Sequence, residues 1–135
     1  MNKHLKITIS LIFLFAIGNA QNLVPNGDFE TYSICPGNYG ELYKATPWFQ
    51  PTAGTSDYLN ACHNGVAGVP VNYFGNQPAR SGSGYAGFFV FEVCSLCQSR
   101  EYIEVELTSP LVAGLTYYVN FHVVLAGHAD YQSSN

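Results

Sequence analysis

Residues 101–125 read EYIEVELTSPLVAGLTYYVNFHVVL, and the alternation in this stretch decides the fold class. Apolar side chains alternate with two glutamates over 103–107, and aromatic and aliphatic side chains alternate with other residues over 117–125. The connection SPLVAG holds a proline, which a central ladder excludes, and a glycine, which turns favour. The pattern predicts two antiparallel strands that each bury one face under a second layer. The sequence therefore predicts an all-β fold.

The first twenty residues, MNKHLKITISLIFLFAIGNA, have the pattern of a secretory signal peptide. Two lysines precede a short apolar run, and small residues precede the cleavage point. The apolar run is shorter than the ~20 residues that a membrane-spanning helix needs, although an N-terminal anchor helix is the alternative. We predict a mature chain that begins at Gln21, does not span the membrane and is exported to the periplasm, the cell surface or the medium.

The predicted mature chain is acidic and rich in aromatic residues and glycine. Three basic residues, Lys44, Arg80 and Arg100, remain against nine acidic ones. A chain without a basic cluster is not typical of a nucleic-acid-binding protein. The full chain has ten tyrosines, nine phenylalanines and 13 glycines, with only 10 % charged residues, a composition typical of a turn-rich extracellular β domain. No linker divides residues 21–135, so we predict one domain.

The last ten residues, AGHADYQSSN, continue no strand pattern. The predicted strand 115–125 would then lie at the edge of its sheet. We expect the β domain to be incomplete at Asn135 and the chain to be part of a longer protein.

Four cysteines follow the signal segment, and in an exported protein they predict disulfides. Three pairings are possible. Cys94 and Cys97 lie close enough in CSLC to pair across a tight loop, which leaves Cys35 with Cys62. The alternatives are a redox pair, which normally begins a helix, and a zinc site, which would need paired ligands that this sequence does not offer.

Four further short strands are expected before residue 101. They are an edge strand at 28–30 with Phe29 facing inward, two short strands at 55–59 and 71–74, and a central apolar strand at 85–93. The only tryptophan, Trp48, is either a core side chain or a stacking platform for a sugar ring.

The segment NLVPNGDFE at 22–30, followed by Trp48 and by GLTYYVNFHVVLAG at 114–127, resembles secreted β-sandwich modules of carbohydrate-binding families four and nine. The mature chain is more similar to the N-terminal domains of exported Bacteroidota proteins. That similarity rests on the ordered segments 22–30, 35–36, 55–62, 79–88 and 100–126. The resemblance implies a jelly-roll-like, galactose-binding-like β-sandwich. Such domains often precede an outer-membrane-protein-A-like peptidoglycan-binding domain or a sorting segment.

The resemblance also implies a structural calcium ion. In the carbohydrate-binding modules the opening strand helps to hold calcium, which would assign Glu30 and Asp28 as ligands here. Calcium takes six to eight oxygens, so two carboxylates supply only part of a site. The alternative is that both carboxylates face solvent from an edge strand.

Exposed aromatic residues are the candidates for ligand binding, because their rings can stack on sugars. We expect Tyr58, Tyr73, Phe74, Tyr85, Tyr102 and Tyr118 in loops or on solvent faces, with Trp48, Tyr73 and Tyr102 as the binding residues. The alternative is that most of these rings cover the edges of a small core.

No enzyme signature is present in the sequence. Glu104 and Glu106 would lie about 7 Å apart on one face of a strand, which is close to the separation of the two catalytic carboxyl groups in glycosidases. Alternating glutamates are, however, ordinary on an exposed strand face. The turn RSGSG at 80–84 has neither the context of a hydrolase nucleophile nor that of a phosphate loop. We predict a non-catalytic module that binds a glycan or another cell-envelope component. The alternatives are a structural envelope module and, less favoured, a glycan hydrolase.

Overall fold

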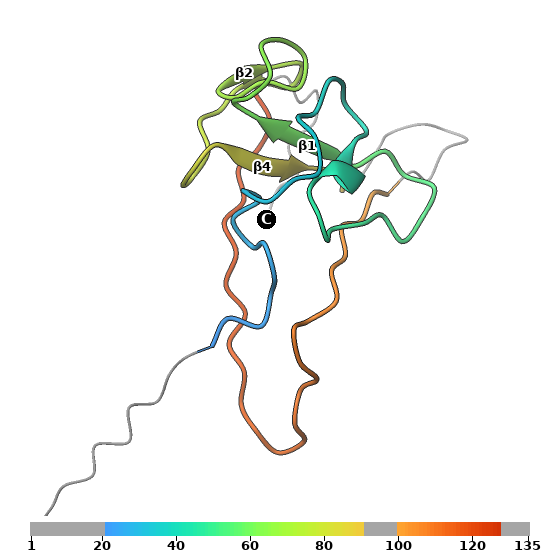
Figure 1. The fold of residues 1–135 in the computed structure, drawn as a ribbon, viewed down its shortest axis with the longest axis vertical. Helices are drawn as coiled ribbons and strands as arrows, with labels where there is room; N and C mark the ends of the chain where they lie inside the picture. The colour runs from blue at the N-terminus through green and yellow to red at the C-terminus, as the bar shows by residue number, and fades with distance from the viewer. Residues whose placement is uncertain (1–20, 91–99, 128–135) are drawn as a thin grey trace, which may run out of the picture.

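The computed structural model describes residues 21–90 and 100–127, and its regular structure there is two small antiparallel sheets (Figure 1). Strand β1 (Asp57–Asn60) pairs with β4 (Gly84–Gly87), so that Asp57 lies opposite Gly87 and Asn60 opposite Gly84. Strand β2 (Val71–Asn72) pairs with β3 (Gly75–Asn76) across a tight turn. One 3-10 turn, η1 (Leu42–Lys44), precedes them. The all-β, antiparallel fold class is confirmed.

Two of the predicted strands are present in shortened form. The pattern at 55–59 corresponds to β1, and the pattern at 71–74 corresponds to β2 and the turn after it. The apolar run at 85–93 begins in β4, but Phe88, Phe89 and Val90 are exposed rather than central, and 91–93 lie outside the described residues. Two glycines in β4 explain its shortness, because glycine adds no side chain to a sheet face.

The predicted edge strand at 28–30 is wrong. The chain turns here, and both Asn26 and Phe29 adopt positive φ angles, 48° and 60°. The Phe29 amide donates to the Asn26 carbonyl at 3.1 Å, which closes a reverse turn. The Pro-Asn-Gly sequence favours such a turn over a strand, because asparagine and glycine tolerate the left-handed region.

The core is small and half of it is polar. The buried apolar residues are Leu42, Ala45, Tyr58, Leu59 and Ala67, and the buried polar ones are Ser56, Asp57, Asn60, Asn72 and Glu101. In the described residues, each buried side-chain nitrogen and oxygen has a hydrogen-bond partner. Satisfied polar groups therefore take a structural role that larger domains give to apolar packing.

A disulfide joins Cys35 to Cys62, and this is the bond expected if Cys94 pairs with Cys97. It closes a sequence separation of 27 residues and ties the turn before η1 to the end of β1. The predicted partner pair, Cys94 and Cys97, lies outside the described residues.

The C-terminal segment differs most from its prediction. Over 103–107 the alternation is visible in the exposure, because Ile103, Val105 and Leu107 are half-buried and both glutamates are exposed. The expected ladder between 101–107 and 117–125 does not form, and residues 108–127 are exposed on both faces. In Figure 1 these residues run down one side of a long projecting loop and up the other.

The first half of this segment bonds to other parts of the chain instead. Glu104 forms an isolated bridge with Phe49 through two backbone bonds of 2.9 Å. Thr108 donates its backbone N–H to the Leu23 carbonyl at 2.9 Å. At the loop tip, the Tyr117 hydroxyl accepts the Val112 amide at 2.9 Å. Backbone groups that the prediction assigned to one hairpin are thus divided among distant partners.

The described residues contain no helix that is both long enough and apolar enough to cross a membrane. The predicted signal segment, residues 1–20, lies outside them.

Candidate functional site

Asn26 organises the opening motif. Its side-chain amide donates to the carbonyls of Thr31 and Thr46, both at 2.8 Å, and its side-chain oxygen accepts the Thr31 amide at 2.8 Å. Its carbonyl accepts the Trp48 indole N–H at 2.8 Å. One residue therefore joins the N-terminal turn to the segment around Trp48, and the motif acts as an internal connector.

Trp48 is partly buried and its polar atom is occupied. Its ring stacks on Phe29 with centroids 4.9 Å apart and planes inclined by 26°, while its N–H donates to Asn26. This arrangement corresponds to the core interpretation of Trp48 more closely than to a free sugar platform.

Glu30 holds the glycine-rich turn at 80–84. Its Oε1 accepts the backbone amides of Ser83 at 2.7 Å and Gly84 at 2.9 Å. Gly82 has φ +63°, and a Cβ at this position would overlap the Glu30 carboxylate. Successive N–H groups in such a turn form a concave anion site, and here the anion is a side chain of the same protein.

Asp28 and Glu30, the two predicted calcium ligands, lie two residues apart in the opening motif. Asp28 is exposed, and its Oδ1 accepts the Glu30 amide at a long 3.5 Å, while Glu30 is engaged in the glycine-rich turn. Within 21–90 and 100–127, no three His, Cys, Asp or Glu side chains gather as a metal site would require. Calcium binding stays a prediction that these two carboxylates alone cannot fulfil.

Two further carboxylates are buried near the start of β1. Glu101 accepts the Thr55 amide at 2.8 Å, the Thr55 hydroxyl at 2.6 Å and the Phe89 amide at 2.9 Å. Asp57 accepts the Gly40 amide. Burial raises the pKa of Asp57 to about 6, and repulsion from Glu101 adds to the rise while the Gly40 bond opposes it. Both acids are used as acceptors for backbone N–H groups.

The buried hydroxyls belong to the same kind of network. Tyr58 donates to the Phe29 carbonyl at 2.9 Å and accepts from the Asn60 amide at 2.8 Å. Burial raises the pKa of Tyr58 to about 12, which keeps the phenol neutral. Tyr85 accepts from Asn72 at 2.7 Å and donates to the Gln77 carbonyl. The prediction that Tyr58 lies on a solvent face is wrong, because the ring fills the centre of the core.

Three exposed rings and one half-buried ring, Phe74, form a set called the aromatic row below, which consists of Tyr39, Tyr73, Phe74 and Phe89. Adjacent centroids lie 5.4, 5.4 and 6.1 Å apart in that order. Tyr73 is 62 % exposed, and Tyr39 and Phe89 are also exposed. The planes are inclined to one another by 39°, 87° and 72°, so the row is a twisted surface rather than a flat one. Tyr73 is the predicted binding residue that the structure places here.

A shallow pocket of about 430 Å³ adjoins the row at Tyr73. Its other lining residues are Asn64, Gly65, Val66, Val71 and Asn72. None of these side chains is ionisable. The buried Asn72 amide is already bonded to Gly68, Phe74 and Tyr85, so Asn64 supplies the amide group beside the aromatic ring. Amides and a ring face can together bind a neutral polar molecule with apolar patches.

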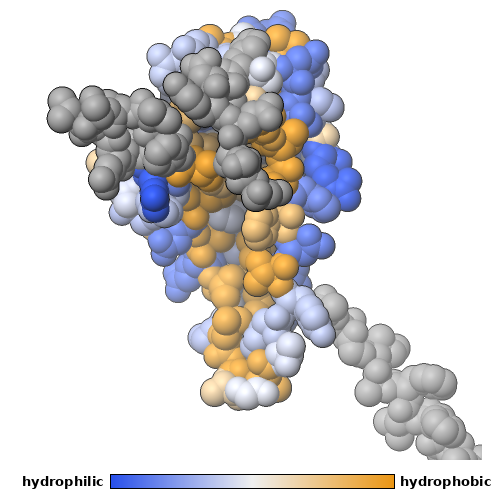
Figure 2. All heavy atoms as spheres, turned by 180° about the vertical axis from the view of Figure 1, so that it is seen from behind, coloured by the Kyte–Doolittle hydropathy of each residue, from blue (hydrophilic) through white to orange (hydrophobic). Residues whose placement is uncertain are grey.

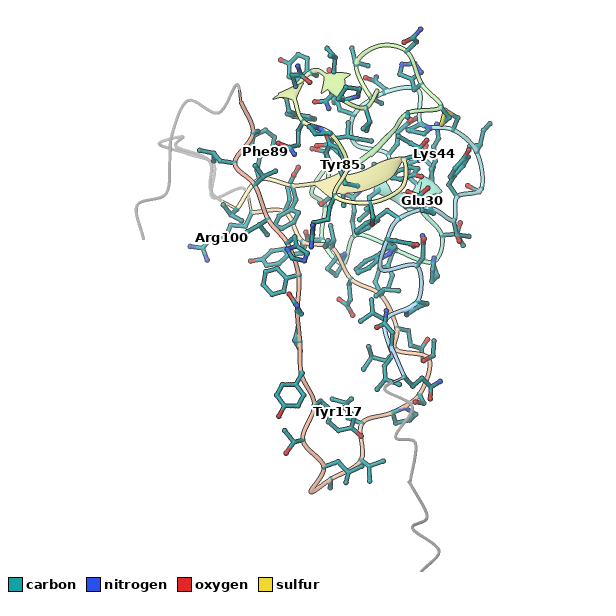
Figure 3. The ribbon with its side chains drawn as sticks, turned by 90° about the vertical axis from the view of Figure 1, so that its left-hand side faces the viewer. Glu30, Lys44, Tyr85, Phe89, Arg100 and Tyr117 are labelled. Carbon is teal, nitrogen blue, oxygen red and sulfur yellow. A yellow bond between two sulfur atoms is a disulfide. The ribbon has the colours of Figure 1, made fainter. Side chains whose placement is uncertain are left out.

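The other predicted residues lie elsewhere. Tyr102 is exposed on the C-terminal segment, where its carbonyl accepts the Ser56 hydroxyl at 3.0 Å. Glu104 and Glu106 are exposed, and neither lines the described pocket. Tyr118 is exposed on the projecting loop, and Figure 3 shows its neighbour Tyr117 far from Tyr85 and Phe89.

Sequence reasoning missed Tyr39 and Phe89 as members of the aromatic row. Tyr39 lies in the turn-rich stretch CPGNYG, whose only signal was the adjacent cysteine. Phe89 lay in a strongly apolar run that predicted burial on both faces. No periodic pattern links residues 39, 73 and 89, so only the tertiary structure reveals the row.

Comparison with known proteins adds no assignment: no protein-family model, curated protein or solved structure matches this chain.

Proposed function

We propose that the protein is a non-catalytic, exported binding module and that its aromatic row binds a neutral glycan, on a cell surface or in the envelope. The observation that supports this most is the exposure of Tyr73 within the row, beside a pocket that the Asn64 amide lines. Sugar rings offer apolar C–H faces to aromatic rings and hydroxyls to amides. A twisted row suits a flexible or curved chain better than a flat crystalline surface.

Export is part of the proposal. It rests on the signal-like residues 1–20 and on the Cys35–Cys62 disulfide, a bond typical of oxidising compartments. The proposal also retains the jelly-roll-like sandwich as the fold of the wider family that the sequence resembles. The antiparallel pairing in both small sheets supports this part of the proposal.

A glycan array followed by affinity electrophoresis tests the binding. We expect Tyr73→Ala to weaken binding of the identified glycan about tenfold or more, because a lost stacking ring removes roughly 1.4 kcal/mol. The matched control is Tyr43→Ala, which removes an exposed tyrosine of η1 that lies outside the row. Equal affinity of the two variants, or no binding to any glycan, would overturn the proposal.

A purely structural envelope module is the second candidate. It is favoured by the opening motif, whose Asn26, Glu30 and Trp48 all serve internal contacts. The two candidates predict different results for Tyr73→Ala. The change weakens glycan binding if the protein is a binding module, and it has no effect on the function of a purely structural module. Turnover of a glycan that is lost in Glu104→Gln or Glu106→Gln would instead support a hydrolase.

A further inference from the structure

Residues 117–125, called the C-terminal arm below, form an extended stretch that has no backbone hydrogen-bond partner within 21–90 and 100–127. Among the described residues, none of its backbone N–H groups donates to another backbone carbonyl. One face carries Tyr117, Val119, Phe121, Val123 and Leu125. The other carries Tyr118, Asn120, His122 and Val124. An extended stretch with free N–H and C=O groups is a template for pairing with another strand.

The arm also exposes apolar side chains along its whole length. Tyr118 is 95 % exposed, Val119 85 % and Phe121 74 %. Figure 2 shows hydrophobic side chains gathered on the projecting part of the molecule that holds these residues. Soluble monomers rarely expose so continuous an apolar surface, so a partner that covers it is expected.

The residue types of the arm are symmetric about Phe121. If a second arm runs antiparallel about a two-fold axis at Phe121, Val119 lies opposite Val123, and Tyr117 lies opposite Leu125. On the other face Asn120 meets His122, and Tyr118 meets Val124. Apolar side chains thus meet apolar ones, and the two polar side chains meet each other, which is the arrangement that cross-strand pairing favours. Such self-complementarity is the signature of an isologous interface.

Charge points to the same partner. No Asp, Glu, Lys or Arg occurs between Glu106 and Asp130, so two arms meet without like-charge repulsion. Pairing the arm with residues 101–107 of another copy would instead bury a strand that carries Glu104 and Glu106 without opposing cations. From these observations we propose that the protein forms a two-fold dimer through antiparallel pairing of its C-terminal arms, with Phe121 at the axis.

The interface is expected to be weak. Nine residues from each copy are fewer than the 20–30 residues per side of a standard interface, and a two-stranded ribbon alone is marginal. A dissociation constant in the micromolar range is therefore expected. The half-buried face of Ile103, Val105 and Leu107 offers further apolar surface against which the paired arms can lie.

Sedimentation equilibrium of the secreted protein tests the dimer. We expect a monomer–dimer equilibrium, and we expect Phe121→Lys to raise the dissociation constant at least tenfold by placing two ammonium groups at the axis. Phe121 is exposed in the protomer, so this change leaves the fold intact by circular dichroism. The control Val112→Lys introduces the same charge at the loop tip and leaves the dimer unchanged. A chain that is still monomeric at about 100 μM, a hundredfold above the expected dissociation constant, overturns the proposal. So does a dimer that Phe121→Lys does not weaken.

Cysteine pairing tests the register separately. Phe121→Cys should form a disulfide-linked dimer with itself, because the residue at a two-fold axis lies opposite its own copy. Val119→Cys alone should not, but a mixture of Val119→Cys and Val123→Cys should give the crossed dimer. Equal self-linkage of Val119→Cys and Phe121→Cys would contradict the register. Glycan binding by Tyr73 is not read out in either experiment, so this inference and the proposed function fail independently.

Discussion

Residues 21–90 and residues 100–127 both contain many tyrosines and valines, yet they are stabilised in different ways. The first region has little regular sheet, but its chain is fixed by a disulfide and by carboxylates that accept backbone N–H groups. The second region has the strongest strand pattern in the sequence, yet its residues 108–127 are exposed. Strand propensity without a partner strand therefore does not produce a sheet.

The carboxylates account for much of this contrast. Glu30 holds the turn at 83–84, Glu41 accepts the amides of Gly37 and Asn38, and Glu101 accepts those of Thr55 and Phe89. A carboxylate bound to backbone N–H groups makes strong, charge-assisted hydrogen bonds. Acidic residues that suggested a surface or a calcium site are thus part of the internal framework.

Removal of the disulfide is the largest expected change to the first region. Loop-closure entropy for 27 residues predicts that Cys35→Ser with Cys62→Ser lowers the free energy of unfolding by about 3.5 kcal/mol. Urea unfolding monitored by tryptophan fluorescence measures this change, because Trp48 lies in the same region. A loss below about 1 kcal/mol would mean that the hydrogen-bond network holds this region without the bridge.

Glu101 joins the two regions, and its removal should be the next largest effect. Glu101→Ala leaves the Thr55 and Phe89 amides without their acceptor, and we expect a loss of about 3 kcal/mol in unfolding free energy. Glu101→Gln keeps an acceptor oxygen and should lose less than half as much. Hydrogen exchange at the Thr55 and Phe89 amides distinguishes the variants. Unchanged protection in Glu101→Ala would contradict this role.

Asp57 should make the stability of the first region depend on pH. Its pKa is raised to about 6 in the fold, above the ordinary 3.8, so the folded state binds the proton more tightly than the unfolded chain does. The contribution of this group is therefore most favourable below pH 4 and is lost as the pH rises through 6. Asp57→Asn, which cannot ionise, should match the wild type at pH 4 and exceed it by on the order of 2 kcal/mol at pH 8.

Denaturant unfolding at pH 4, 6 and 8 measures that difference. Glu106→Gln is the matched control, since it makes the same kind of carboxylate-to-amide change at an exposed position. An Asp57→Asn profile parallel to the wild type would show that Asp57 does not cause the dependence.

The smallest effect is expected in the projecting loop. Val112→Ala removes an exposed side chain and should change the free energy of unfolding by less than about 0.5 kcal/mol. The corresponding truncation in the core, Leu59→Ala, should lower the free energy of unfolding by about 3 kcal/mol, because the Leu59 side chain on β1 is buried. Similar losses for the two variants would remove the contrast between the regions.

Local features of the fold could be predicted from the sequence. The alternation at 103–107 predicted which side chains face inward, and the strand patterns at 55–59 and 71–74 lie close to β1 and β2. In the opening motif the turn residues Pro-Asn-Gly lie in a turn, but the edge strand predicted at 28–30 is wrong, because the turn continues to Phe29. Its asparagine and glycine were the signal that favoured the turn.

The candidate site was predicted only at Tyr73. Trp48 and Tyr73 look alike in sequence, as aromatic residues in turn-rich loops, but Phe29 covers one face of Trp48 while Tyr73 remains 62 % exposed. Glu30 and Glu101 likewise look like surface carboxylates until their amide partners, 53 and 46 residues away, are known. Exposure and hydrogen-bond partners at such separations leave no periodic trace in a sequence.

The sequence by itself determined the β class, the turn positions, the absence of a basic surface and a disulfide between Cys35 and Cys62 as one of the possible pairings. These properties follow from residue type and spacing over a few positions, where steric preference and alternation act. Only the tertiary structure decided which carboxylates hold the backbone, which rings form the aromatic row and which predicted strand stays unpaired. Those outcomes depend on contacts between distant segments, whose energies are set by burial and geometry rather than by local propensity.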